Sequence, residues 1–128
     1  MEITKVLGMT FRTGPLVLTD MHNGGSIFGV IYVQVLSFGE GGEVTLHNEI
    51  EADRSHGLGW KEAMERERWT GSCSFDPDGK HVKCTLVNER TQREKVIYAD
   101  FSGPERLITE VYDDGSAHGR GQVFMRTY

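Results

Sequence analysis

The sequence predicts a mainly β fold, an antiparallel up-and-down β-barrel of about seven to nine strands that leaves room for one short helix. Three stretches, residues 38–44, 75–82 and 112–125, carry an aromatic side chain, a short turn rich in Gly or Asp, and then a β-branched apolar run. Glycine adopts positive φ at no steric cost and Asp hydrogen-bonds to the turn backbone, so such clusters are typical of hairpins. Successive hairpins favour the barrel, and a two-sheet β-sandwich is the alternative.

The length and charge of the chain limit its class. A chain of 128 residues fits a single domain over residues 1–128, because domains cluster at about 100 to 150 residues. Its net charge of −5 argues against binding to phosphate backbones, which depends on Lys and Arg displacing counterions. No apolar run approaches the roughly 20 residues that cross a bilayer, and no basic segment followed by an apolar stretch opens the chain. We therefore expect a cytoplasmic protein that binds neither nucleic acid nor membrane.

The first part of the chain predicts a broken strand and then a hairpin. Residues 2–7 and 9–18 alternate weakly, and the Gly-Pro pair at 14–15 interrupts them with a turn or bulge. Residues 27–38 are the clearest strand, apolar on both faces, and residues 43–50 are its hairpin partner. A strand that is apolar on both faces needs cover on each side, so the sequence also allows a homodimer.

Residues 52–68 have the least β-like composition of the chain. Within them, residues 60–68 carry good helix formers, and the spacing of Lys61 and Glu65 suits an ion pair along one helix face. A short helix is one prediction. The alternative is a long strand over residues 65–75, whose charged start lies in solvent or lines a polar cavity.

The remaining strands are expected at residues 69–75, 82–86, 94–101, 105–112 and 121–128. In the hairpin between the first two of these, Cys73 is expected to lie opposite Cys84. A cross-strand disulfide is therefore geometrically conceivable. Two half-buried free thiols in a reducing compartment are the favoured interpretation.

Two short segments resemble a known type of barrel. Residues Trp69-Thr70-Gly71 and a terminal Phe124-Met125-Arg126 are similar to the calycin or lipocalin-like pattern, in which an Arg near the end of the chain packs over a Trp near its start. In this chain the Trp lies in mid-chain. The order of elements over residues 27–128 also resembles these barrels, whose meandering strands close around a cavity. The resemblance implies a barrel with an enclosed pocket and assigns no ligand.

No catalytic, metal or cofactor site is predicted. The histidines form no pair that would hold a metal from one face; they are at positions 22, 47, 56, 81 and 118. The turns at 76–79 and 113–115 look like fragments of calcium loops and lack the further oxygens of an EF-hand. Cys73 with His81 is the nearest approach to a nucleophile and its base, and the apolar register of Cys73 disfavours its thiolate.

The sequence also contains a cluster of alternating charges whose cationic members are Arg66, Arg68, Arg90 and Arg93. It either lines a polar mouth able to take a carboxylate or phosphate, or forms a solvated face. Gln34 interrupts an apolar strand face that includes Tyr32, and Trp60 follows a Gly-rich loop. The candidate ligand-binding residues are therefore Tyr32, Gln34, Trp60, Arg68 and Trp69.

Three functions follow from these expectations. The first is a non-catalytic barrel that binds a small, largely apolar ligand in its interior, since a barrel of about eight strands is just wide enough for one. The second is a protein-interaction or immunity-type accessory module whose acidic surface meets a basic partner. The third and least favoured is a barrel isomerase or cyclase that encloses a reactive apolar substrate. The expected partner is accordingly a small apolar molecule or a protein.

Overall fold

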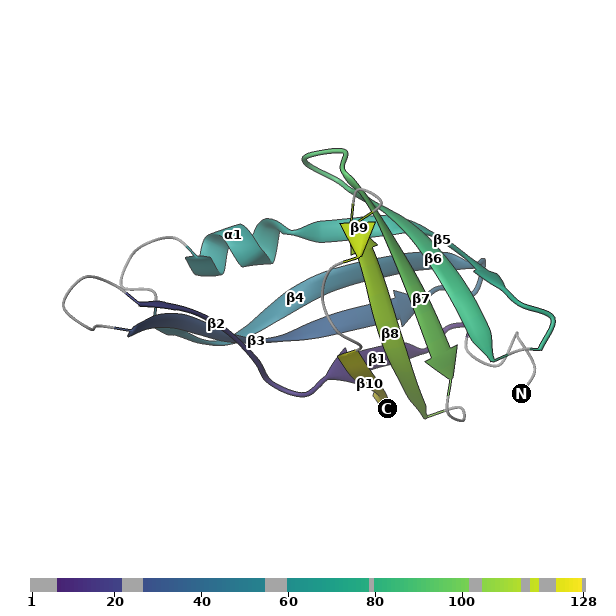
Figure 1. Cartoon of the computed structure of the whole chain (residues 1–128), viewed down its shortest axis with the longest axis horizontal. Helices are drawn as coiled ribbons and strands as arrows, with labels where there is room; N and C mark the ends of the chain where they lie inside the picture. The colour runs from purple at the N-terminus through teal and green to yellow at the C-terminus, as the bar shows by residue number, and fades with distance from the viewer. Residues whose placement is uncertain are drawn as a thin grey trace.

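A computed structural model describes the backbone of residues 7–21, 27–54, 60–78, 80–101, 105–113, 116–117 and 122–127. Side chains are described for the same residues apart from 18–21, 27–28, 60, 110–113 and 116–117. Within these ranges the chain forms ten strands and one helix (Figure 1). They are β1 (Thr10–Thr13), β2 (Leu16–Met21), β3 (Ile27–Phe38), β4 (Glu43–Arg54), α1 (Trp60–Arg66), β5 (Arg68–Phe75), β6 (His81–Asn88), β7 (Glu94–Phe101), β8 (Arg106–Asp113), β9 (Ser116–Ala117) and β10 (Gln122–Thr127).

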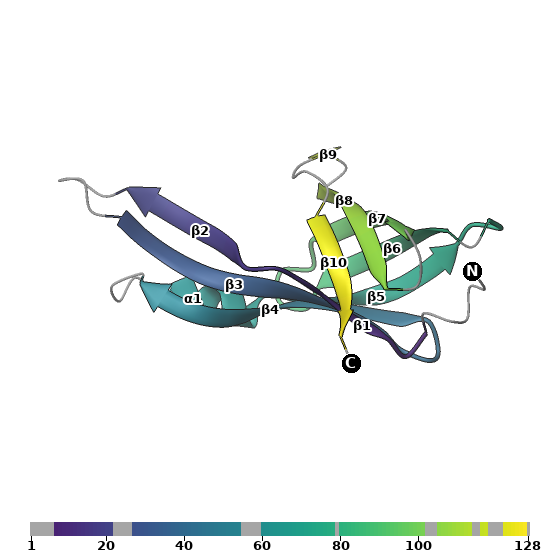
Figure 2. The same cartoon turned by 90° about the horizontal axis from the view of Figure 1, so that it is seen from below.

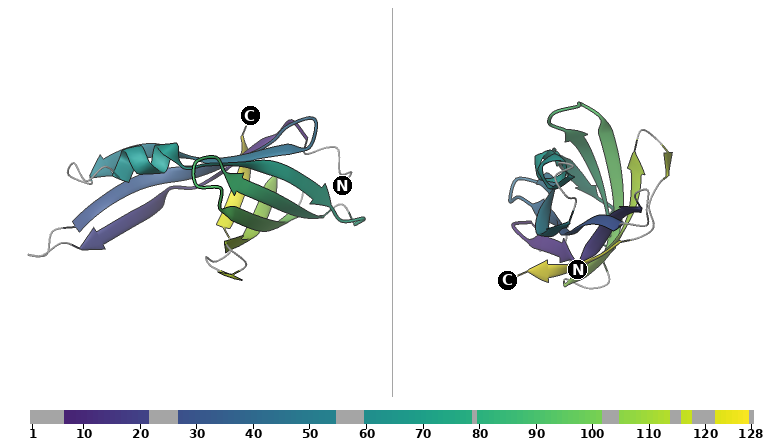
Figure 3. Two further views of the ribbon diagram at one scale, coloured as in Figure 1. Left: turned by 90° about the horizontal axis from the view of Figure 1, so that it is seen from above. Right: turned by 90° about the vertical axis from the view of Figure 1, so that its left-hand side faces the viewer.

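The strands form one antiparallel sheet that closes on itself. Its neighbours in order are β1, β10, β8, β7, β6, β5, β4 and β3, and β3 pairs again with β1. Two of the ten strands lie outside this ring, since β2 pairs with β3 and β9 with β8. The remaining eight strands make a closed barrel, seen end-on in Figure 3. The predicted antiparallel barrel is confirmed, and the alternative of a two-sheet sandwich is wrong.

β1 and β2 follow one another along β3. Arg12 pairs with Val35 and Leu16 with Tyr32, so three residues of the first segment oppose two of β3. The extra residue falls at the exposed Gly-Pro pair at 14–15. Proline has no N–H to give to a strand ladder and is tolerated at such bulges. The predicted interruption is confirmed.

Three strands extend beyond the barrel (Figures 1 and 2). In the described part of the chain, β4 pairs with β5 only over residues 43–47, while its second half continues along β3 to Arg54. β2 pairs with the other edge of β3 over residues 27–32. We call β2, residues 27–32 of β3 and residues 48–54 of β4 the arm. The strand predicted at 43–50 is therefore four residues too short.

α1 packs against β4 of the arm. Asn48 Nδ2 donates a hydrogen bond of 3.2 Å to the carbonyl oxygen of Met64. Lys61 and Glu65 form the expected ion pair at 3.9 Å, which is exposed and stabilises a helix by only about 0.5 kcal/mol or less. An isolated helix of seven residues is unstable in water, so contact with β4 stabilises it. The predicted helix is confirmed, and a strand from residue 65 is wrong because β5 begins at Arg68.

The other strands lie close to their predicted bounds. Those at 27–38 and 94–101 match them, and the rest of the second half of the chain differs by one or two residues at an end. Residues 2–6 of the first predicted strand lie outside the described residues. No helix in the described ranges is long and apolar enough to cross a membrane.

Cys73 and Cys84 lie opposite one another, as predicted, and both are free thiols. Burial, reinforced by the charge of a nearby Cys73 thiolate, raises the pKa of Cys84 to about 12. Burial also raises the pKa of Cys73. Both side chains therefore stay protonated near neutral pH, which suits their place in an apolar interior.

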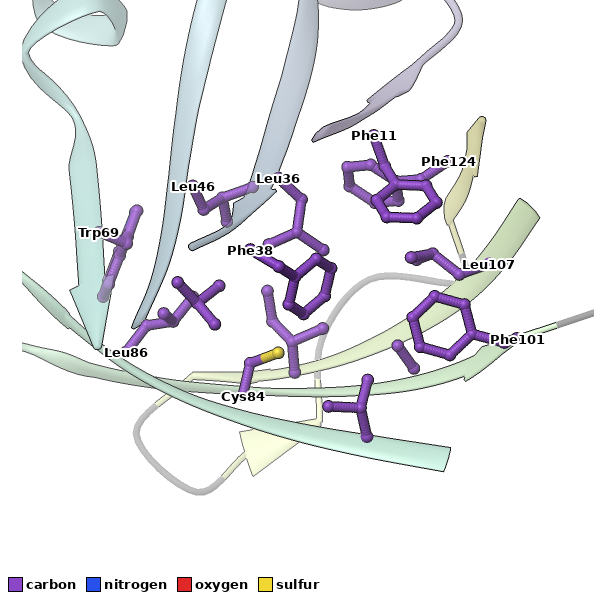
Figure 4. Packing of buried hydrophobic residues seen from close by; sticks show 14 residues of the cluster. Phe11, Leu36, Phe38, Leu46, Trp69, Cys84, Leu86, Phe101, Leu107 and Phe124 are labelled. Atoms are coloured by element: carbon purple, nitrogen blue, oxygen red, sulfur yellow. The ribbon is translucent and has the colours of Figure 1, made fainter. Parts of the chain in front are cut away.

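The barrel interior contains a continuous apolar core (Figure 4). The rings of Phe11, Phe38 and Phe101 contact one another with centroids 5.8 to 6.3 Å apart. Aromatic rings attract at such distances when they meet edge-on or tilted. Trp69 lies at the opposite end of this cluster from Phe101. Side chains therefore fill the interior at its phenylalanine-rich end.

The outer face of β3 is covered within the chain. Val33 and Val35 are only 4% and 3% exposed, although they alternate with the core residues of β3. Arg12 pairs with Val35 and Glu49 with Val33, and the Arg12 and Glu49 side chains form an ion pair across β3. Their aliphatic stems thus cover the two valines. This face of β3 is therefore covered within the chain at Val33 and Val35, whereas Val17, which pairs with Ile31 on the same face, is 60% exposed. The homodimer stays a prediction.

Candidate functional site

A layer of polar side chains lies on the interior face of the barrel at the end nearest the arm. Its members are Gln34, Asn48, Asn88 and Lys95, together with Trp69. Directly paired residues of antiparallel strands point to the same face, and Gln34 pairs with Asn48 and Trp69 with Asn88. Each polar member lies two residues from an apolar core residue of its own strand, so they are consecutive inward-facing positions. The interior therefore changes from apolar to polar between one inward-facing residue and the next. We call this set the polar layer.

Lys95 and Trp69 form the centre of the polar layer. Lys95 is 8% exposed and Trp69 is 4% exposed. The Lys95 ammonium lies over the indole, with Nζ 4.1 Å from the ring centroid. A buried cation is costly unless it is compensated, and a cation over an indole face is attracted by about 0.5 to 2 kcal/mol. The indole therefore helps to keep a lysine inside the barrel.

Glu67 connects α1 to β5, and its side chain points toward Trp69. Its Oε1 accepts a hydrogen bond of 3.2 Å from Trp69 Nε1. The Glu67 N–H in turn donates to the carbonyl of Met64 at 3.2 Å, which closes the last turn of α1. Burial raises the pKa of Tyr32, and the negative charge of Glu67 raises it further. Tyr32 thus presents a neutral hydroxyl on the arm side of Glu67.

A pocket of about 290 Å³ opens beside this group. It lies between α1 and the β6–β7 turn, and we call it the mouth pocket. Its lining residues are Ala63, Met64, Glu67, Trp69, Asn88, Arg90, Thr91 and Arg93. A second pocket of about 10 Å³, enough for roughly one water molecule, shares Glu67 and Trp69 with it. The second pocket is also lined by Gln34, Asn48 and Lys95, so it lies within the polar layer, on the other side of Glu67 and Trp69 from the mouth pocket.

Asn88 determines the shape of the β6–β7 turn. Its Oδ1 accepts hydrogen bonds from the backbone N–H groups of Arg90, at 2.9 Å, and Thr91, at 3.0 Å. Its backbone N–H donates to Arg93 O at 2.9 Å, and Gln92 adopts a φ of 63°. Such side-chain capping is the usual reason that Asn begins a turn. One buried amide thus fixes the backbone that carries both arginines of the mouth pocket.

The structure brings three of the five candidate ligand-binding residues together. Gln34 and Trp69 line the smaller pocket, and Tyr32 is close enough to Glu67 to be influenced by its charge. Arg68 does not join them, because its side chain is on the exposed face of β5 and lies 3.8 Å from Glu89. Trp60 begins α1, and its side chain lies outside the described residues. Whether these residues bind a ligand stays a prediction.

Sequence reasoning missed Asn88 and Lys95 as site residues and included Glu67 only as one of the alternating charges that line a polar mouth in one of two alternatives. A signal for Lys95 exists, because it alternates with the apolar residues Ile97, Ala99 and Phe101 and therefore points inward. Asn88 falls between the strands expected at 82–86 and 94–101, whereas it is both the last residue of β6 and the cap of the turn that follows. The sequence does not show that Glu67 contacts Trp69, because that contact depends on how α1 meets β5.

A second cluster lies in the β5–β6 turn, where Asp76, Asp78 and His81 have ligand atoms within 4.8 Å of one another. His81 Nδ1 lies 2.5 Å from Asp78 Oδ2, and its Nε2 lies 3.0 Å from Asp100 Oδ1. Asp78 Oδ1 also accepts the backbone N–H groups of Lys80 and His81. These bonds stabilise the hairpin turn and explain the cluster without a ligand.

No protein-family model, curated protein or solved structure matches this chain. Its function must therefore be argued from the mouth pocket and the polar layer.

Proposed function

We propose that this protein binds a small molecule at the mouth of its barrel. The observation that carries the proposal is the mouth pocket of about 290 Å³, a volume close to the lower end of small-molecule sites, which run from about 300 to 1,000 Å³. Its walls combine the apolar Ala63 and Met64 with polar groups held by Asn88. Three of its eight lining residues are apolar, and the other five supply polar or charged groups that can orient a ligand.

The proposal places the ligand at the mouth rather than deep in the barrel. Phenylalanine rings occupy the far end of the interior, and the smaller pocket has room for about one water molecule. The resemblance to calycin-like barrels implies a pocket enclosed by the strands, which supports binding of a small molecule but assigns no ligand and no place at the mouth. The protein-interaction and barrel-enzyme alternatives stay predictions.

The test is a titration of small neutral and charged fragments, followed through the Trp69 indole N–H resonance in a ¹H–¹⁵N spectrum. The resonance is assigned with a Trp60→Phe variant. We expect saturable shifts, because Trp69 Nε1 donates to Glu67 at the wall of the mouth pocket. Ala63→Phe should weaken binding at least about tenfold by filling the pocket, since one or two blocked side-chain contacts correspond to about 1.4 kcal/mol.

Lys61→Phe is the matched control, because Lys61 is an exposed residue of the same helix and does not line the mouth pocket. It should leave binding unchanged. If no fragment shifts the Trp69 resonance, or if Lys61→Phe weakens binding as much as Ala63→Phe does, the proposal is wrong.

A further inference from the structure

We infer that the ligand of the mouth pocket carries a carboxylate, which Arg90 of the β6–β7 turn holds, and an uncharged body that lies toward Met64 and Trp69. This inference rests on the proposed function and adds the chemical class of the ligand. Two observations support it. The charges around the mouth pocket are mainly positive, and its one carboxylate, Glu67, is already hydrogen-bonded to Trp69.

The local charge of the mouth pocket is opposite to that of the chain. The chain has a net charge of −5, whereas the pocket is lined by two arginines and a single carboxylate, Glu67. A concave site whose sign differs from that of the surrounding protein concentrates ligands of the opposite charge.

The two acidic residues of the β6–β7 segment, Glu89 and Glu94, do not line the mouth pocket. Glu89 lies 3.8 Å from Arg68 on the outer face of the barrel. Glu94 is exposed and alternates with the inward-facing Lys95. Among the described residues, no carboxylate lies within ion-pair distance of the Arg90 guanidinium.

The backbone of the turn holds Arg90 and Arg93 in fixed positions. The Asn88 amide accepts the Arg90 N–H, and the Asn88 N–H donates to the Arg93 carbonyl. A guanidinium presents a planar fork that matches the two oxygens of a carboxylate. A preorganised turn reduces the entropy that is lost when such a group is bound.

Glu67 determines the orientation of the ligand. Its carboxylate accepts the Trp69 indole N–H and lies close enough to Tyr32 to influence that phenol. A second carboxylate beside it would be repelled, so the ligand's charge belongs at the arginine side of the pocket. The opposite wall, formed by Ala63 and Met64, then takes the uncharged body.

The experiment compares benzoate, phenylacetate, 3-phenylpropionate and hexanoate with their primary amides, which have the same shape and no charge. The Trp69 indole resonance gives the dissociation constant for each compound. We expect each acid that binds to bind at least about tenfold tighter than its amide, because only the acid makes a charge-assisted contact with the Arg90 guanidinium. In Arg90→Gln the preference should fall to less than about threefold.

Arg68→Gln is the matched control, because it removes the same charge from the outer face of β5. The preference for acids should survive in this variant. If acids and amides bind equally to the unaltered protein, or if Arg68→Gln removes the preference as fully as Arg90→Gln does, the carboxylate inference is wrong while the binding function stands. If none of these compounds binds, the proposed function is wrong as well.

Discussion

Lys95 occupies an interior position in β7 that alternation would normally give to an apolar residue. The indole of Trp69 accounts for part of its stabilisation there, since Nζ lies 4.1 Å from the ring centroid. The sequence gives the direction in which Lys95 points, but not the ring it meets. That contact joins β5 and β7 across β6, and residue spacing along one strand contains no information about it.

Cys73 and Cys84 show the opposite case. Their direct pairing could be predicted, because the Asp-rich turn at 76–79 fixes the register of the hairpin. Counting residues outward from that turn then places Cys73 opposite Cys84. The same counting places Trp69 on the inner face of β5. Side-chain direction within one hairpin is therefore predictable, whereas contacts between hairpins are not.

His81 gives a prediction at this scale. The hydrogen bond that His81 Nδ1 donates to the Asp78 carboxylate raises the pKa of His81 above 6.5, and the nearby charges of Asp100 and Asp76 raise it further. The same contact lowers the pKa of Asp78, after the larger effect of the Lys80 N–H. We expect an NMR titration of His81 to show a pKa above 6.5 that falls most in Asp78→Asn and least in Asp76→Asn. Equal decreases in both variants would contradict the assignment.

The sign of the pH dependence follows from these directions. The folded hairpin binds the His81 proton more tightly than the unfolded chain, so this contribution to stability is fully present below pH 6.5 and is lost as pH rises through the raised pKa. The Asp78 contribution is present above pH 3.8 and is lost as pH falls through the lowered pKa. The β5–β6 turn is therefore most stable between these two limits.

At the scale of elements, the strands with strong alternation or two apolar faces have the bounds that the sequence predicts, as β3 and β7 do. The last four residues of β4, 51–54, were not predicted. They include Glu51 and Asp53, whose polarity is typical of a loop. They remain in a strand because β3 continues to pair with them past a register shift at Glu51, and α1 packs on β4.

Likewise, the mouth pocket could be predicted only in part. The alternating charges of residues 65–68 and 89–94 indicate a polar mouth, which was one of two alternatives. Its other wall depends on the angle between α1 and β5, which no local pattern in the sequence determines. Tyr32, Gln34 and Trp69 could be chosen from strand faces, while Glu67 could not.

Gly71 provides a prediction for the pairing of β5 with β6. A Cβ atom placed on Gly71 would lie 1.8 Å from the carbonyl oxygen of Thr85, which belongs to the β6 backbone. We expect Gly71→Ala to lower the free energy of unfolding by about 1 to 3 kcal/mol, because the two strands must separate to admit the methyl group. Urea denaturation measures this change.

Gly14→Ala is the matched control for that variant. A Cβ at Gly14 has no described atom within 4 Å, and its φ is not positive. Its substitution should leave stability unchanged or raise it by up to about 1 kcal/mol. A loss for Gly14→Ala as large as that for Gly71→Ala would show that the contact with Thr85 is not the cause.

For the whole molecule, the decisive event is the closure of the barrel. β1 completes the ring by pairing with both β3 and β10. Its Phe11 is fully buried and contacts Phe38 and Phe101. The hairpin order of the sequence predicts a barrel, but the arm outside it was not predicted, because no pattern in residues 27–38 shows where the barrel ends and the arm begins.

A substitution at Phe11 tests whether β1 stabilises the closed barrel. We expect Phe11→Ala to lower the free energy of unfolding by about 3 to 5 kcal/mol, since it leaves a cavity where β1 meets the core. Val17→Ala, on the exposed side of β2, should change it by less than about 0.5 kcal/mol. Urea denaturation followed by far-ultraviolet circular dichroism measures both. Similar losses in the two variants would contradict the central place of Phe11 in closure.

The pairing of β1 with β10 also affects how this chain is made. Thr10 lies beside Thr127 in the finished barrel, so a ribosome must synthesise the chain as far as residue 127 before the pairing of β1 with β10 is complete. Until residues 122–127 emerge, β1 and β8 each present an unpaired edge, which is the kind of surface that nascent chains use to associate wrongly. A translational pause after β8 would prolong the exposure of both edges, whereas a pause before β7 would prolong, of these two, the exposure of the β1 edge alone.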